Sequence, residues 1–140
     1  MQRKLTDTVE KRIQEARQEI QGKFGICFSE AENGTACGEM NIQPKHRNLY
    51  GIPYGGVMFN LADNTAGMAF LSAGGNGITV SGNVNYLRGA SPEADKLLCR
   101  ATVKKAGRKL YFLSAEVTDT FGTILSEYSF VFTNLSPEEQ

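Results

Sequence analysis

The sequence has few cysteines and histidines. Its 140 residues include one histidine and three cysteines, at positions 27, 37 and 99. The cysteines are widely spaced and form no C-x-x-C pair, the spacing typical of zinc sites. An odd, dispersed set is typical of reduced, buried thiols in an intracellular protein. The pattern argues against a metal site, and we expect no metal or redox cofactor.

Net charge and long apolar runs are also missing. Fifteen Lys and Arg residues balance fifteen Asp and Glu. Without net charge, no long-range field attracts nucleic acid or an anionic membrane, so we expect neither as a partner. The start, MQRKLTDTVEKRIQ, lacks the apolar core of a secretory signal, and no later run approaches the ~20 apolar residues that span a bilayer. We therefore expect a cytoplasmic protein.

Residues 1–22 are predicted to form an N-terminal amphipathic helix. Apolar residues follow one another at offsets of four, three and four: Val9, Ile13, Ala16 and Ile20. Charged residues fill the other faces, and Gly22 follows the stripe. Such a narrow stripe must dock on the same domain or on a neighbouring subunit.

Residues 23–136 are predicted to form one α+β domain. KFGICFSE and TACGEMNI alternate with a period of two around Asn33-Gly34, which predicts a β-hairpin. A helix is expected from about Gly55 to Ser72. Four further strands with short turns favour an antiparallel meander: ITVSGNVNYL, LLCRATVKK, LYFLSAEVTDT and TILSEYSFVFTN. The final SPEEQ has the composition of a disordered tail.

One stripe of the second predicted helix is polar or small. Its members lie at i, i+3, i+4 and i+7: Asn60, Asp63, Asn64 and Gly67. The pattern alone favours a stripe that faces water, because carboxylates are seldom buried. The alternative is that the stripe faces a cleft and a second subunit.

The residues before this helix carry a resemblance. Asn48, the run Tyr54-Gly55-Gly56 and Asp63 resemble the signature N-x-x-G-x-x-H-G-G-x-x-x-x-x-x-D of hotdog-fold acyl-CoA thioesterases of the PaaI (phenylacetic acid degradation) or 4-hydroxybenzoyl-CoA thioesterase type. ITVSGNVNYLRGA and VKKAGRKLYFLSAEVTD are also similar to that family. The similarity covers about residues 35–133 and implies a hotdog fold: an antiparallel sheet of about six strands wrapped around one long helix, here with an additional N-terminal helix.

The resemblance implies hydrolysis of an aryl- or fatty-acyl-CoA thioester. The helix start near Gly55 presents free N–H groups, which suit the oxygen that gains charge during the reaction. The resemblance makes the Gly55 amide the main donor, with Asn48 holding the carbonyl or the water and Asp63 acting as base or nucleophile. Glycines at positions 55 and 56 would let the thioester approach the backbone closely.

Asp63 is too far from Gly55 to share one site within a chain. Eight residues separate them, roughly 12 Å along a helix axis. A two-fold dimer resolves the distance, and the resemblance implies that Asn48 and Gly55 act opposite Asp63 of the partner subunit. We therefore expect a homodimer or homotetramer.

A hydroxyl beside the carboxylate would help to position water. In ITVSGN, Thr79 and Ser81 are predicted to lie on the same side of a strand. Aligned on the N-V-N-Y-L end of the strand, the family's assisting serine falls on Thr79, with Ser81 as the alternate. The threonine is equally explained by its general preference for strands.

Coenzyme A, as part of the substrate, carries phosphates that need local cations. Arg88 ends one predicted strand, and a basic cluster surrounds the Gly107 turn: Lys104, Lys105, Arg108 and Lys109. Arg88, Arg108 and Lys109 are predicted to bind the substrate, together with Tyr54, Gly56 and Ser81. An ordinary solvated hairpin explains the basic turn as well.

Tyr54 departs from the resemblance, because the family has histidine there. Both side chains donate one hydrogen bond, but tyrosine takes up no proton near neutral pH. A non-catalytic acyl-CoA or acyl-carrier binding protein on the same fold is therefore the alternative. Hydro-lyase action on an enoyl thioester is less favoured, because the histidine-bearing motif for that chemistry is missing.

Overall fold

The described part of the chain folds as two helices and one sheet, and the predicted α+β class is confirmed. The computed structural model describes residues 2–135. The elements in chain order are α1 (Gln2–Phe24), β1 (Cys27–Glu32), β2 (Thr35–Asn41), a 3₁₀ turn η1 (Pro44–His46), α2 (Gly55–Ser72), β3 (Gly77–Tyr86), β4 (Lys96–Ala106), β5 (Leu110–Asp119) and β6 (Ile124–Asn134). The predicted tail, residues 136–140, lies outside the described residues. The division of the chain at residue 22 stays a prediction.

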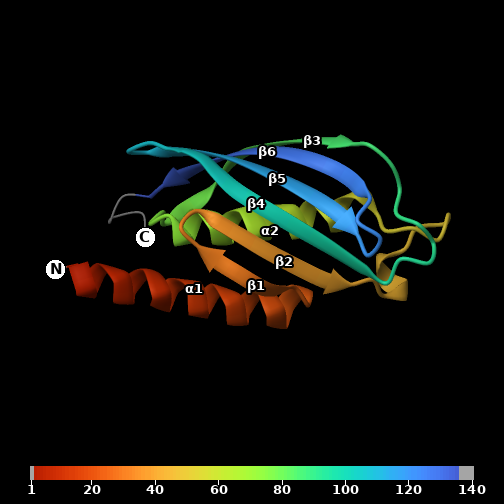
Figure 1. The fold of residues 1–140 in the computed structure, drawn as a ribbon, viewed down its shortest axis with the longest axis horizontal. Helices are drawn as coiled ribbons and strands as arrows, with labels where there is room; N and C mark the ends of the chain where they lie inside the picture. Colours follow the sequence, from red (N-terminus) through yellow and green to blue (C-terminus); the bar gives the residue numbers. More distant parts are fainter. Residues whose placement is uncertain (1, 136–140) are drawn as a thin grey trace.

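The six strands form one antiparallel sheet in the order β1-β2-β4-β5-β6-β3 (Figure 1). β4, β5 and β6 form the expected meander, but the prediction that β3 lies beside β4 is wrong. β3 pairs with β6 at the sheet edge. Residues 87–95 are long enough to cross the strand ends, and the Leu87 and Arg88 amides both donate to Leu125 O, which holds the crossing against β6.

The first hairpin turns at Asn33-Gly34, as predicted. Both residues have positive φ, 52° and 81°, as a two-residue type I′ turn requires. The Gly34 amide also donates to Ser72 Oγ at 2.9 Å. This bond ties the hairpin to the end of α2.

The inner face of the sheet packs against α2, which lies behind it in Figure 1. Alternate residues of the strands point inward, such as Leu97, Cys99 and Ala101 on β4. The buried side chains of α2 are Met58, Leu61, Ala62, Thr65, Ala66, Met68, Ala69 and Phe70. The predicted wrapping of one long helix by the sheet is confirmed.

Helix α1 docks on its own domain. It contacts α2 and β1, and Ile13, Ala16 and Ile20 pack against the core. Of the two surfaces predicted for the apolar stripe, its own domain or a neighbouring subunit, the stripe packs on its own domain. Within residues 2–135, neither helix is both long and apolar enough to cross a membrane.

Candidate functional site

A carboxylate and a hydroxyl meet at a hollow between α2 and β3. Thr79 Oγ1 donates a hydrogen bond of 2.8 Å to Asp63 Oδ1, and both residues are half-buried. They line a hollow of about 310 Å³ whose wall includes apolar side chains from both helices and from β6: Ala16, Ile20, Met68, Phe70, Leu71 and Phe132. A polar pair therefore stands at the edge of an apolar hollow.

Thr79 and Ser81 do not lie on the same side of β3, so that prediction is wrong. The β3–β6 register shifts between them, so that Thr79 pairs with Phe132 and Ser81 pairs with Val131. Neighbouring residues of β6 face opposite sides of the sheet, so this bulge turns the two hydroxyls apart. Thr79 contacts Asp63, whereas Ser81 is exposed.

Asn48, Gly55 and Arg88 line a second hollow, of about 360 Å³, at the other end of β3. Asn48 Oδ1 accepts hydrogen bonds from the amides of Tyr50 (2.9 Å) and Ile52 (3.4 Å). This turn leaves the side-chain N–H₂ of Asn48 without a partner among the described residues. The loop therefore presents an amide donor to the hollow.

The start of α2 presents two further donors. The Val57 and Met58 amides donate to Tyr54 O. The Gly55 and Gly56 amides make no hydrogen bond to any residue in the range 2–135, as expected in a first helical turn. Tyr54, the residue before them, is 51% exposed, and its side chain makes no capping bond to the described part of the chain.

Tyr86 contacts Gly55 in a way that the sequence did not reveal. Its hydroxyl donates to Gly55 O at 2.9 Å. A Cβ on residue 55 would lie 3.0 Å from Tyr86 Cζ, whereas a Cβ on Gly56 would meet no atom within 4 Å. Gly55 thus makes room for a tyrosine ring within the protomer, besides any room it leaves for substrate. Sequence spacing holds no signal for this contact, because the end of β3 and the start of α2 meet only in the folded chain.

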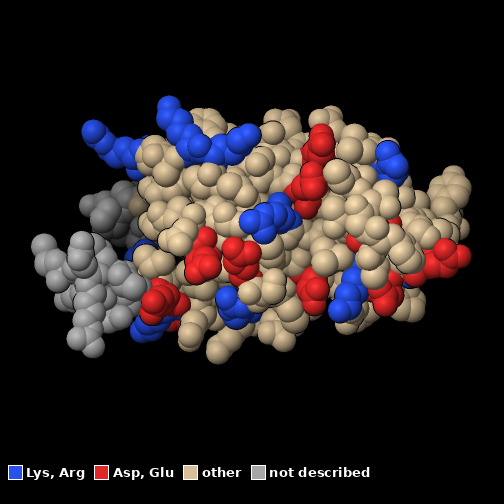
Figure 2. Space-filling model, in the orientation of Figure 1, with Lys and Arg blue, Asp and Glu red and all other residues tan. Residues whose placement is uncertain are grey.

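The predicted cations do not form one cluster in the protomer. Figure 2 shows basic side chains gathered over the β4–β5 turn, where Lys104, Lys105, Arg108 and Lys109 are exposed. This turn lies beside the start of β3, because Lys109 O bonds Asn134 and Asn134 pairs with Gly77. Arg88 follows the end of β3, roughly 30 Å along the strand. Arg108 and Lys109 therefore lie toward the Asp63 end, and Arg88 lies in the Gly55 hollow.

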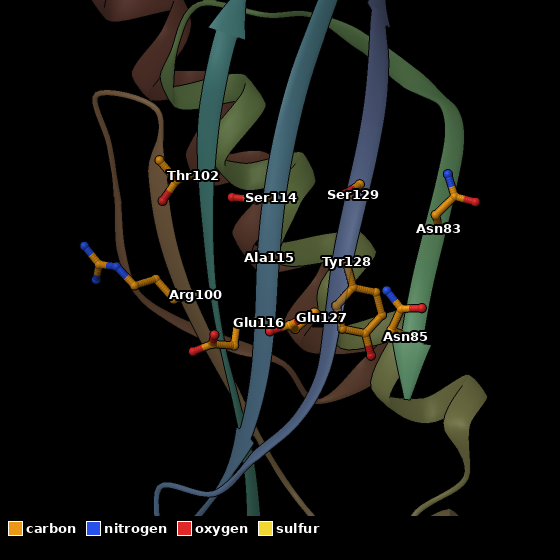
Figure 3. Close-up of a pocket in the computed structure, with 10 residues that line it drawn as sticks. All are labelled: Asn83, Asn85, Arg100, Thr102, Ser114, Ala115, Glu116, Glu127, Tyr128 and Ser129. Carbon is orange, nitrogen blue, oxygen red and sulfur yellow. The ribbon is translucent and has the colours of Figure 1, made fainter. Parts of the chain in front are cut away.

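The outer face of the sheet carries a third hollow, of about 440 Å³ (Figure 3). It contains none of the predicted site residues. Arg100, Glu116 and Glu127 form one row across β4, β5 and β6, with the two carboxylates directly opposite each other. Arg100 pairs with Glu30 at 3.5 Å, and neither Glu116 nor Glu127 has an ion pair within the described part of the chain. We assign no reaction to this face.

Across residues 2–135, no group of three or more His, Cys, Asp or Glu side chains is placed to hold a metal ion.

Comparison with known families matches residues 50–124, just over half of the chain, to the Thioesterase superfamily. A curated protein of Archaeoglobus fulgidus, named as a candidate esterase, is 27% identical over 97 residues, which cover 69% of this chain. The matched region spans 62% of that relative's length.

Solved structures bear on the predicted fold. The PaaI protein of the Escherichia coli phenylacetic acid degradation operon superposes with a TM-score of 0.80, at 18% identity, over 91% of this chain and 99% of that one. A hypothetical thioesterase of Streptococcus pneumoniae, solved with coenzyme A, gives a TM-score of 0.75 at 19% identity over 83% and 97% of the two chains. Further structures with that description carry single alanine replacements of an aspartate and of a threonine. The predicted hotdog fold and the predicted resemblance are confirmed.

Proposed function

This chain belongs to the thioesterase superfamily, and from that premise we propose that it hydrolyses the thioester of an aryl- or fatty-acyl-CoA at sites shared between two copies of the chain. One observation carries the proposal. The polar groups that this chemistry needs occupy two separate hollows, Asn48 and the Gly55 amide in one and Asp63 with Thr79 in the other. Each hollow is half of a site.

The edge strand β3 supports the sharing of sites. Its outer edge has no neighbouring strand among the described residues, and it exposes 55% of Ile78 and 57% of Val80. Such an edge is a template for another strand. Antiparallel pairing of β3 with β3 of a second copy would set the start of one strand beside the end of the other. The Asp63–Thr79 pair would then lie next to the Gly55 hollow of the partner subunit.

The same pairing would complete the cation set. Arg108 and Lys109 lie toward the start of β3, and Arg88 follows its end. In an antiparallel β3 pair, the basic turn of one chain approaches Arg88 of the partner subunit. Lys and Arg side chains bind phosphates well, so the shared site would hold the phosphates of the coenzyme A moiety. We propose the homodimer as the smallest active unit and a homotetramer as a pair of such dimers.

The proposed chemistry follows from the positions of the donors. The carbonyl oxygen of the thioester accepts from the Gly55 amide and from the Asn48 side chain, where negative charge develops as the carbonyl is attacked. Asp63 of the partner subunit accepts a hydrogen bond from Thr79 of the same subunit. This carboxylate either activates a water or attacks the carbonyl itself. The apolar hollow beside this carboxylate would take the acyl group, and Tyr54 and Gly56 would border the thioester.

The relatives' descriptions supply further support. The Streptococcus pneumoniae thioesterase was solved with coenzyme A. The aspartate and the threonine replaced in its variants are 16 positions apart, as are Asp63 and Thr79. This match favours a carboxylate–hydroxyl pair that serves the reaction over a threonine that merely suits a strand.

The proposal is tested with purified protein and a panel of aryl- and alkyl-CoA esters. We expect release of free thiol, lost on Asp63→Asn and on Asn48→Ala. Equal rates in the wild type and Asp63→Asn would exclude the assignment. Saturable binding of a CoA ester without thiol release would favour the alternative of a non-catalytic acyl-CoA or acyl-carrier binding protein, which Tyr54 in place of histidine keeps open. A single turnover in ¹⁸O water tests for direct attack by Asp63, because ¹⁸O enters the protein only if Asp63 forms an anhydride with the acyl group and water then opens it at the Asp63 carbonyl.

A further inference from the structure

We infer that Tyr86 is a positioning residue for the backbone donors at the start of α2, acting through the Gly55–Gly56 peptide. The inference rests on the proposed function, because those donors belong to the proposed site. It adds Tyr86 to that site and gives the Gly56 amide the role of a second donor to the thioester oxygen.

The geometry of one peptide carries the argument. The carbonyl that Tyr86 holds at 2.9 Å belongs to the same peptide group as the Gly56 N–H. A hydrogen bond to a carbonyl polarises its peptide and strengthens the N–H as a donor. The Gly56 N–H has no partner among the described residues, and the space beside Gly56 is open. The tyrosine therefore strengthens a donor that remains available.

The neighbouring donor has a matching arrangement. The Gly55 N–H shares its peptide group with Tyr54 O, which accepts from the Val57 amide at 3.1 Å and from the Met58 amide at 3.3 Å. Both free N–H groups thus lie on peptides whose carbonyls are hydrogen-bonded. Backbone bonds supply this to the first peptide, and in the second the Tyr86 hydroxyl adds a bond to a carbonyl that also accepts within the first turn of α2.

The fit of the ring fixes the position of the peptide as well. A Cβ on residue 55 would come within 3.0 to 3.2 Å of three atoms of the Tyr86 side chain. The ring also lines the hollow that holds Asn48 and Gly55. Burial raises the pKa of the Tyr86 hydroxyl. The group stays protonated, and therefore a donor, at neutral pH.

The test is Tyr86→Phe, which removes the hydroxyl and keeps the ring. Tyr111→Phe is the matched control, since Tyr111 is also on a strand and has no side-chain hydrogen bond within residues 2–135. Removal of an oxyanion donor costs 10²–10³-fold, and weakening one costs less, so we expect kcat on an acyl-CoA to fall about 3- to 10-fold with KM changed less than about twofold. An unchanged kcat, or a loss confined to KM, would overturn the inference.

A double-variant cycle tests the route of the effect. Gly55→Ala would crowd the Tyr86 ring, because its Cβ would lie 3.0 to 3.2 Å from three atoms of that side chain, and would thereby strain the same hydrogen bond. Tyr86→Phe should therefore cost little in the Gly55→Ala background, because both changes act on one contact. Full additivity of the two losses would contradict the proposed coupling.

A spectroscopic measurement separates this inference from the proposed function. In protein labelled with ¹⁵N-glycine, Tyr86→Phe should move the Gly56 amide proton upfield, while Tyr111→Phe should leave it in place. An unmoved Gly56 signal overturns the inference whether or not the enzyme turns over. If wild-type protein releases no thiol from any CoA ester, the proposed function fails, and the amide signal alone decides the role of Tyr86.

Discussion

Thr79 Oγ1 lies 2.8 Å from Asp63 Oδ1 and donates a hydrogen bond to it. The two residues come from different elements, the middle of α2 and the start of β3. A hydroxyl that donates to a carboxylate fixes its orientation and still leaves its second oxygen free. The bond therefore presents one oxygen of Asp63 to whatever enters the hollow.

We expect Thr79→Val to lower kcat about 10-fold, because the carboxylate loses its orienting partner while the side-chain shape is kept. Thr79→Ser should retain most of the activity, since the hydroxyl remains. Steady-state assays of the two variants against one CoA ester check this. Equal activity in Thr79→Val and the wild type would show that the hydroxyl has no part in the reaction.

Charge placed on the β3 edge should separate the copies. Ile78 and Val80 are more than half exposed on this strand. We expect Ile78→Lys or Val80→Lys to shift the proposed dimer toward the monomer and to abolish thiol release, because each proposed site needs two chains. Light scattering after gel filtration measures the mass. Phe121→Lys, on an exposed residue of the β5–β6 turn, is the control and should keep both mass and activity. A fully active monomer would contradict the shared site.

The buried thiol of Cys99 links stability to alkaline pH. Burial raises the pKa of Cys99 from 9.0 to about 12. The unfolded chain therefore releases this proton at lower pH than the folded chain, and the stabilising contribution is full below pH 9 and is lost as pH rises toward 12. The free energy of unfolding should fall more steeply with pH in the wild type than in Cys99→Ala, by up to about 1.4 kcal/mol per unit. Urea unfolding at several pH values tests this, and parallel pH profiles would refute it.

The opposed carboxylates on the outer face should destabilise the fold. Glu116 and Glu127 are directly opposite on β5 and β6. We expect Glu127→Gln to raise the free energy of unfolding by about 0.5 kcal/mol, because like charges in this position repel. Glu39→Gln is the matched control, since Glu39 has Lys96 as a partner at 3.7 Å and should gain nothing. Equal effects of the two substitutions would argue against a specific repulsion.

The sequence predicted what depends on neighbouring residues. Local hydrophobic periodicity and turn-forming residues predict the bounds of α2, the Asn33-Gly34 turn and the residues that form the six strands. The spacing of Gly55 and Asp63 along one helix likewise located them in different hollows.

Features that depend on distant parts of the chain were missed. The place of β3 beyond β6 is set by a crossing connection, which local pattern does not encode. The bulge that turns Ser81 away from Thr79 is a matter of register between strands. The contact of Tyr86 with Gly55 and the distance of Arg88 from Arg108 also exist only once the sheet has formed.

The proposed sharing of the site between two chains is tested most directly by mixing two inactive variants. Asp63→Asn and Asn48→Ala should each release little thiol alone. In a mixed dimer, one site combines the intact Asn48 of one chain with the intact Asp63 of the other, while the second site carries both lesions. Random exchange of subunits should therefore restore about one quarter of the wild-type activity. A mixture that exchanges subunits, verified by mass spectrometry, and yet stays as inactive as its components would contradict a site built from two chains.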